Sequence, residues 1–253
     1  MKKEIRQISD DGKIIRVTIA DERFYIKTLD DGTFVEYPSV TWITDVGYPK
    51  GIGYFKWLAN QGWDNAEKIS SEARKRGSKV HQAVSSLILG NEVRMDDKFT
   101  NDDGLEEELT LSEYDCLLAF RDFHEEKKPT YVLNEYAVFN EKPRYAGTLD
   151  IICDMDAERW LLDVKTGGIW PSYGSQLSAY KHADSLPEEL RPKKMGILQL
   201  DVKQNKNKKW RLTEINDEIH LFHACREIWN KEYEGTELWK KDYPVSIKLL
   251  TPS

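Results

Sequence analysis

Apolar residues recur along this chain with two different spacings, which predict two kinds of element. Between residues 64 and 89 they return every three or four positions, as at Ile69, Ala73, Val80 and Val84, and this period predicts one long helix. Further helices are expected over residues 112–127 and 172–185 and after Asn216. Asn216 is expected to cap the last of them, which should pack through one apolar stripe of Ile219, Phe222, Cys225, Ile228 and Trp229. Apolar or alternating runs predict strands over residues 130–140, 144–155, 158–166 and 193–213.

The order of these elements predicts an α/β fold, with a mixed central β-sheet flanked by helices. Before them, residues 3–37 contain short apolar runs separated by Asp-Asp-Gly turns, which predict a small β-meander. We expect this meander, residues 1–40, to be an N-terminal appendage of one larger domain, residues 41–253. A chain of 253 residues can bury one substantial core.

Two stretches are interpreted with less help from periodicity. The first, residues 42–63, is rich in aromatic side chains, namely Trp42, Tyr48, Tyr54, Phe55, Trp57 and Trp63. Exposed rings stack on the bases of a single strand, whereas buried rings form the core of a small lid, and we favour the core. The second, residues 92–109, is acidic and has no period, so we expect an exposed loop.

Charged residues interrupt two of the expected strands. Asp150 stands in an apolar run, and Asp163 and Lys165 fall in the next strand, although buried strands rarely hold charges without a reason. Because side chains alternate along a strand, Asp163 and Lys165 point to the same face. The polar connection over residues 154–158 is short enough for a hairpin, so we expect antiparallel neighbours with Asp150 near Asp163.

This set of side chains predicts chemistry on a phosphodiester. Paired carboxylates are hard oxygen ligands that suit Mg²⁺ or Mn²⁺. A lysine beside them, here Lys165, orients or deprotonates a metal-bound water and stabilises the negative charge that develops during cleavage. Without an ion, carboxylates held this close are expected to raise each other's pKa and to destabilise the folded protein near neutral pH.

Three short motifs together resemble those of a known family. They are Gly147 to Asp150 on one strand, Asp163-Val164-Lys165 on the next, and Gln176 to Tyr180 on the following helix. In this order they are similar to the motifs of the PD-(D/E)XK nuclease superfamily, and most similar to its RecB-like exonuclease branch. Leu149 replaces the usual Pro and Asp163 the usual Glu, and both are common variants. The resemblance covers residues from about 69 to 180.

The resemblance implies a restriction-endonuclease-like core and a set of site residues. The metal ligands that it implies are His81, Glu135, Asp150, Asp163 and the carbonyl of Val164. The catalytic residues that it implies are Asp150, Asp163, Lys165 and Gln176. Contacts to nucleic acid are expected from Gln176 and Tyr180 and from the basic residues Arg74, Arg76 and Lys79.

Several of these residues also have ordinary structural interpretations. Alone, His81 is more often a surface or core histidine than a ligand. Glu135 on an edge strand is explained as well by solvent exposure as by a metal. Gln176 and Tyr180, one turn apart, also fit an amphipathic helix that uses Tyr180 as core.

For function, the resemblance implies a metal-dependent DNA nuclease, most similar to stand-alone exonucleases of recombination or repair, including those of phage type. It implies one or two Mg²⁺ or Mn²⁺ ions and DNA as the partner, with a recombination or single-strand-binding protein as a further candidate partner. Two alternatives stay open. One is a sequence-specific endonuclease on the same fold, and the other is a nucleic-acid-binding relative without catalysis.

Composition restricts where such a protein acts and what it binds. The net charge of −7 has the wrong sign for DNA binding by bulk electrostatics, so the basic clusters at residues 74–79 and 203–209 are expected to act locally. No apolar run approaches a membrane span and the first residues do not resemble a signal peptide, so we expect a cytoplasmic protein without membrane contact. The widely spaced Cys116, Cys153 and Cys225 are expected to be reduced core residues. They count against the four-thiolate iron–sulfur cluster of some RecB-like nucleases.

Overall fold

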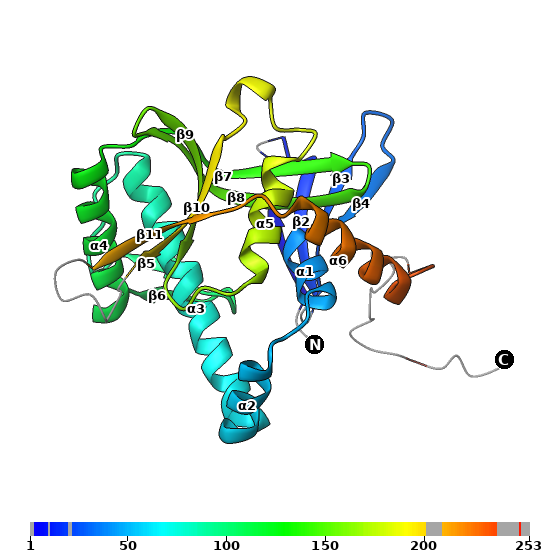
Figure 1. Cartoon of the computed structure of the whole chain (residues 1–253), viewed down its shortest axis with the longest axis horizontal. Helices are drawn as coiled ribbons and strands as arrows, with labels where there is room; N and C mark the ends of the chain where they lie inside the picture. Colours follow the sequence, from blue (N-terminus) through cyan, green and yellow to red (C-terminus); the bar gives the residue numbers. More distant parts are fainter. Residues whose placement is uncertain (1–2, 10, 20–21, 201–208, 237–247, 249–253) are drawn as a thin grey trace.

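A five-stranded sheet forms the centre of the computed structural model, with strand order β11-β10-β9-β8-β7 (Figure 1). Its strands are β7 (Thr130–Glu141), β8 (Arg144–Met155), β9 (Glu158–Lys165), β10 (Lys194–Leu200) and β11 (Trp210–Ile215). Only β9 and β10 are parallel, so the sheet is mixed, as the sequence predicts. The structure describes residues 3–9, 11–19, 22–200, 209–236 and 248, so the basic cluster predicted at residues 203–209 lies outside them except for Lys209.

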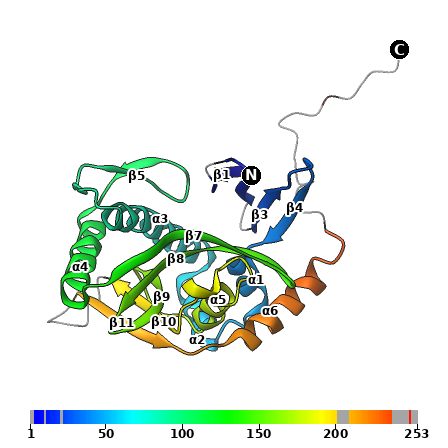
Figure 2. The same ribbon diagram turned by 90° about the horizontal axis from the view of Figure 1, so that it is seen from above.

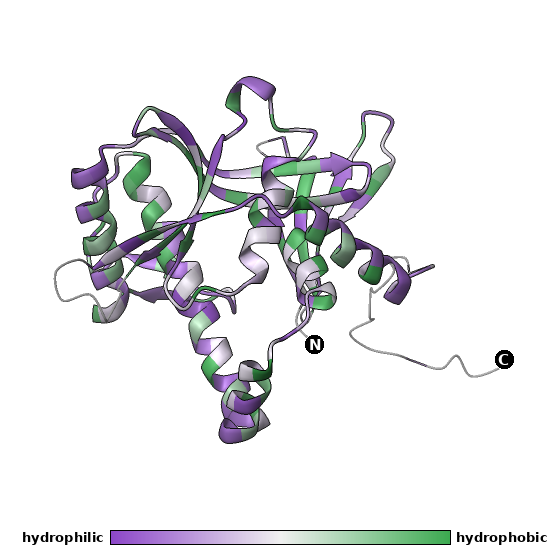
Figure 3. Ribbon diagram, viewed as in Figure 1, coloured by the Kyte–Doolittle hydropathy of each residue, from purple (hydrophilic) through white to green (hydrophobic). Residues whose placement is uncertain are grey.

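Helices cover both faces of this sheet (Figure 2). The long helix α3 (Trp63–Ile88) and α4 (Leu111–Lys127) cover one face, where Leu162 and Leu198 share a core with Phe123. The other face, with Leu161 and Ile197, packs on α1 (Val40–Gly47), α5 (Ser172–Lys181) and α6 (Ile219–Glu232). Alternate strand residues therefore enter two different cores, and the predicted α/β arrangement is confirmed. In Figure 3 the flanking helices show hydrophobic and hydrophilic stretches in turn along their length.

Local signals in the sequence set the limits of the helices. A capping box between Thr110 and Glu113 begins α4, and Gly90, in the left-handed region at φ 85°, follows the end of α3. The expected cap at Asn216 is wrong, because α6 begins after Glu218, whose side chain makes no capping hydrogen bond. Ile228 is also 51% exposed and does not belong to the packed stripe of α6.

The N-terminal residues form the predicted meander, which packs on the central sheet. Its strands β1 (Lys3–Gln7), β2 (Ile14–Ile19), β3 (Glu22–Thr28) and β4 (Phe34–Pro38) pair in chain order and antiparallel. Val17 and Phe24 lie in the same core as Leu149 of β8, and Tyr25 Oη lies 3.0 Å from Thr148 Oγ1. The meander thus supports the strand that carries Asp150, while the domain boundary at residue 40 stays a prediction.

The acidic stretch over residues 92–109 is more ordered than the predicted loop. It contains a hairpin of β5 (Lys98–Thr100) and β6 (Glu106–Glu108). Gln82 of α3 fixes it, because its Nε2 donates to the Thr100 carbonyl at 2.5 Å and its Oε1 accepts from the Thr100 N–H at 3.2 Å. The contact between Gln82 and Thr100 joins two separate segments, so no periodic pattern in the sequence predicts it.

Two short helices complete the described part of the chain. They are α2 (Ile52–Gln61), which precedes α3, and a 3-10 turn over Glu188–Leu190 before β10. Among all the helices of the described ranges, none combines the length and the apolar character that crossing a membrane requires.

Close contact between β8 and α5 generates a first prediction. A Cβ atom at Gly147 would overlap the Tyr180 ring, so we expect Gly147→Ala to lower the free energy of unfolding by about 1–3 kcal/mol. The matched control is Gly77→Ala in α3, where an added Cβ meets nothing within 4 Å. That change should raise stability by about 0.5–1 kcal/mol. Urea denaturation measures both, and equal stabilities of Gly147→Ala and wild type would contradict the packing.

Candidate metal centre

Three acidic residues lie in one row across β7, β8 and β9. The register of β7 and β8 on either side of Glu135 places this residue opposite Asp150. The last pair of the β8–β9 ladder is Ile151 with Leu162, so Asp150 and Asp163 are the next opposed residues. The sequence prediction that Asp150 faces Asp163 is therefore confirmed, and Glu135 extends the row.

A side chain replaces the backbone ladder at this row. The Val164 N–H donates to Asp150 Oδ2 at 2.7 Å, beyond the last pair that β8 and β9 form. The buried amide of Val164 is thus satisfied by a carboxylate. No further residue pair of the β8–β9 ladder follows this hydrogen bond.

Glu135 has an unusual backbone conformation. Its φ of 49° lies in the left-handed region, which non-glycine residues seldom adopt, and β7 also shifts register nearby, between Tyr131 and Leu133. Such conformations cost free energy and gather at functional sites. An ordinary solvent-exposed residue of an edge strand does not need this geometry.

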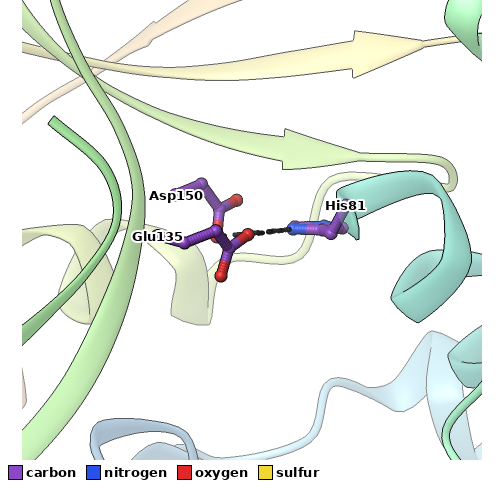
Figure 4. Close-up of side chains that lie close together, drawn as sticks. All are labelled: His81, Glu135 and Asp150. Carbon is purple, nitrogen blue, oxygen red and sulfur yellow. Dashed lines mark ion pairs between the residues drawn. The ribbon is translucent and has the colours of Figure 1, made fainter. Parts of the chain in front are cut away.

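His81 of α3 points at these carboxylates from outside the sheet (Figure 4). Its Nδ1 lies 3.4 Å from Asp150 Oδ1 and 3.8 Å from Glu135 Oε1. Ligand atoms of His81, Glu135 and Asp150 all lie within 4.8 Å of one another, and their side chains are only partly exposed. One imidazole and two carboxylates therefore converge on a volume that one ion can fill.

Asp163 contacts a lysine and a glutamine. Its Oδ2 lies 2.6 Å from Lys165 Nζ, and Gln176 Nε2 donates to its Oδ1 at 3.4 Å. It is 3% exposed and does not belong to the group formed by His81, Glu135 and Asp150. Asp163 contacts the lysine, and its predicted role as a metal ligand stays a prediction.

The surroundings of the two opposed aspartates, Asp150 and Asp163, shift their pKa values in opposite directions. Burial raises the pKa of Asp163, the charge of Asp150 raises it further, and Lys165 only partly opposes them. Burial acts in the same sense on Asp150, but the charges of His81 and Lys165 and the Val164 N–H lower the pKa of Asp150 overall. The expectation that each carboxylate raises the pKa of the other is therefore wrong for Asp150, because a cationic imidazole beside it overcomes the repulsion.

The two cationic groups respond in the opposite sense to burial. Desolvation favours the neutral forms of His81 and Lys165. The charge of Asp150 nevertheless raises the pKa of His81 well above 6.5, and the charges of Asp163 and Asp150 raise the pKa of Lys165 above its usual value. Two positive groups thus balance the acidic row.

Sequence reasoning missed Tyr173, which contacts the site lysine. Lys165 Nζ lies 4.7 Å from the centroid of the Tyr173 ring, within the range of a cation–π interaction. Tyr173 stands three residues before Gln176 on α5, so both side chains leave the same side of the helix. The three-residue spacing from Gln176, a residue of the sequence motif, is the signal that could have identified Tyr173.

The structure corrects two of the expected nucleic-acid contacts. Lys79 is 3% exposed, and its Nζ lies 2.9 Å from Glu113 and 3.1 Å from the carbonyl of Glu108. Tyr180 is also 3% exposed, and its hydroxyl accepts a hydrogen bond from Gln176 Nε2 at 3.2 Å. Lys79 anchors the acidic hairpin and Tyr180 belongs to the core, so neither reaches a ligand at the surface.

The arginines of the same cluster also have protein partners. Arg74 lies 2.9 Å from Glu67 and 3.5 Å from Asp102, and Arg76 donates to Cys116 Sγ at 3.2 Å. Their expected contacts with nucleic acid, like the Val164 carbonyl as a ligand, stay predictions. The three cysteines are buried thiols, as the sequence predicts.

Comparisons with known proteins do not identify the family of this chain. No protein-family model matches the sequence, and no curated protein matches it either. The chemistry must be argued from the side chains themselves. Within the described ranges, His81, Glu135 and Asp150 are the one group of three or more His, Cys, Asp or Glu side chains whose ligand atoms lie close enough together to share an ion.

Asp150 generates a second prediction, for the metal-free protein. Because the pKa of Asp150 is lowered, its ionised form stabilises the fold above pH 3.8, and this stability is lost as the pH falls through the lowered value. Because the pKa of His81 is raised, its protonated form stabilises the fold below pH 6.5, and this stability is lost as the pH rises through the raised value. Between these pH values, Asp150→Asn should lower the free energy of unfolding in chelator by about 1–3 kcal/mol. Asp30→Asn, at a side chain 94% exposed, is the control and should change nothing measurable. Thermal melts compare them, and an Asp150→Asn protein as stable as wild type would mean that the His81 pair adds nothing.

Proposed function

We propose that this protein is a metal-dependent DNA nuclease with a PD-(D/E)XK core, of the RecB-like exonuclease type. One observation carries the proposal. His81, Glu135 and Asp150 converge from a helix and two strands, and the Asp163–Lys165 pair stands beside them on the next strand. A cluster of charges with a purely structural role would not need both a set of possible metal ligands and, on the next strand, a lysine held by an aspartate.

The donor set fits a divalent cation. Two carboxylates supply hard oxygen ligands for Mg²⁺, and the imidazole of His81 also suits Mn²⁺. When bound, the ion would polarise a phosphate oxygen and lower the pKa of a water molecule. His81, Glu135 and Asp150 would hold it, and the Val164 carbonyl is the further ligand that we propose.

Lys165 is the residue that we assign to the reacting groups. Its Nζ is fixed from one side by Asp163 at 2.6 Å and lies over the Tyr173 ring, so it is held in place before substrate binds. Asp163 is in turn held by Gln176. The remaining protons of the ammonium can orient the attacking water and stabilise negative charge on the phosphate.

Two other functions would use the same fold. A relative without catalysis would have no need of Lys165 held by Asp163 and Gln176, which favours the enzyme. A sequence-specific endonuclease differs in substrate rather than in chemistry. Cleavage of end-labelled linear DNA, compared with closed circles, separates the two: loss of linear DNA alone supports the exonuclease, and nicking of circles supports the endonuclease.

The third prediction tests the chemistry. We expect Lys165→Ala to lower cleavage by about 10²–10⁴-fold with Mg²⁺ or Mn²⁺ present. Affinity for the ion should be unchanged or tighter, because a positive charge is removed beside the ligands. Lys194→Ala is the matched control, since Lys194 also lies over a ring, that of Trp160, at 5.1 Å. A nuclease assay and calorimetry decide: normal turnover by Lys165→Ala removes its role, and wild-type cleavage in excess chelator removes the metal.

The fourth prediction concerns His81. Since imidazole is a softer ligand than a carboxylate, His81→Ala should weaken Mn²⁺ more than Mg²⁺, with a loss for Mn²⁺ of about 10–100-fold. His124→Ala is the control, because His124 lies on a different helix, α4, where its Nδ1 contacts the Tyr131 hydroxyl at 3.1 Å. Calorimetric titrations of both ions provide the measurement. Identical titrations of His81→Ala and wild type would show that His81 is not a ligand.

A further inference from the structure

Helix α2 exposes large apolar side chains that a monomer of this kind normally covers. None of its residues is buried, and it stands away from the sheet at the lower end of Figure 1. Ile52 is 72% exposed, Phe55 is 52% exposed, and Trp63, which begins α3, is 71% exposed. The interpretation of residues 42–63 as a buried lid core is therefore wrong for these residues and correct for Trp42, at 4%. Clustered exposure of this kind marks an interaction surface.

Three aromatic rings contact one another along α2, of which Phe55 is exposed and Tyr54 and Trp57 are half-buried. The centroid of the Tyr54 ring lies 5.6 Å from that of Phe55 and 5.9 Å from that of Trp57. Trp63 follows at the first position of α3. A row of aromatic rings, rather than aliphatic side chains, offers flat faces to a flat ligand.

The charge of this surface differs from that of the rest of the chain. From residue 46 to residue 63 the sequence contains Lys50 and Lys56 and no Asp or Glu, although 44 of the 253 residues are acidic. Lys50 forms an ion pair with Asp45, with Nζ 3.3 Å from Oδ1, so Lys56 is the positive charge that this stretch adds beside the rings, in a protein of net charge −7. Aromatic rings beside a lysine are complementary to a polyanion with unpaired bases.

Helix α3 connects this surface with the candidate metal centre. Trp63 and His81 belong to the same helix and are 81 − 63 = 18 residues apart, which corresponds to about 27 Å along the axis. An extended, unpaired strand needs only a few nucleotides to span this distance.

We propose that Tyr54, Phe55, Trp57 and Trp63 form a stacking platform for single-stranded nucleic acid, about 27 Å along α3 from the candidate metal centre. The binding itself stands on the rings and on the lysine beside them. Its role in feeding a strand to the metal centre rests on the proposed nuclease function. The platform then favours substrates with an unpaired end.

Binding is tested in chelator, so that no strand is cut. The probe is a fluorescently labelled oligothymidylate of about twenty nucleotides, compared with a blunt duplex of equal length. The double variant Phe55→Ala, Trp63→Ala should bind the single strand about tenfold or more weakly and the duplex almost as wild type. Phe34→Ala is the matched control, since Phe34 is also 52% exposed but lies in the meander.

Two further variants separate stacking from simple apolar contact. Trp63→Phe keeps a ring and should keep most of the affinity, whereas Trp63→Leu should lose it. A 2-aminopurine in the middle of the strand should be quenched by the wild-type protein and not by the double variant. Equal affinity of wild type and the double variant, or equal binding by the Phe and Leu variants, overturns the platform.

Cleavage distinguishes failure of the platform from failure of the proposed function. If both are right, the double variant degrades the long single strand more slowly than wild type, yet matches wild type on a blunt duplex, which has no unpaired end for the platform to bind. Binding without any cleavage would overturn the nuclease and leave the platform. Dissociation of an oligomer by the double variant, seen by sedimentation without loss of strand binding, would identify the rings as an interface between copies and overturn the platform.

Discussion

The carboxylate of Asp150 is the interaction on which the site depends. It accepts the Val164 N–H at the point where the β8–β9 ladder ends, and it faces His81 across 3.4 Å. One side chain thus terminates a strand pair and anchors a helix to the sheet. A charge in this position is tolerated because a backbone donor and a cationic imidazole both compensate its burial. Without them, the row of acids would repel itself in a poorly solvated place.

The site divides into two parts with different demands. In one, Asp163, Lys165 and Gln176 satisfy one another, so this part is complete within the protein. In the other, His81, Glu135 and Asp150 gather without any donor that matches all their lone pairs, and Glu135 holds a left-handed conformation to take part. The Asp150–His81 pair itself stabilises the fold, so the unfavourable contribution of the second part comes from the conformation of Glu135. A ligand is the natural compensation for the second.

Much of this arrangement follows from local sequence signals. Alternation of side chains and one short hairpin connection were sufficient to place Asp150 beside Asp163, and the helical period gave α3 and α4 nearly complete. Contacts between distant segments could not be predicted in this way. The burial of Lys79 depends on Glu113 and on the acidic hairpin, and the burial of Tyr180 depends on a glycine in another element. Exposure of α2 was missed for the same reason, since aromatic composition does not say whether a partner covers the rings.

The distances along the chain between contacting site residues have a consequence for folding. Gln176 and Asp163 are separated by 13 positions, and Val164 and Asp150 by 14. His81 and Asp150 are separated by 150 − 81 = 69 positions, so their meeting closes a far longer loop. The lysine part can therefore form within one compact segment, whereas the ion-binding part exists only after α3 has docked. Capture of an ion would then depend on a long-range step of folding, and a chain arrested before it would keep its lysine in place with nothing to act upon.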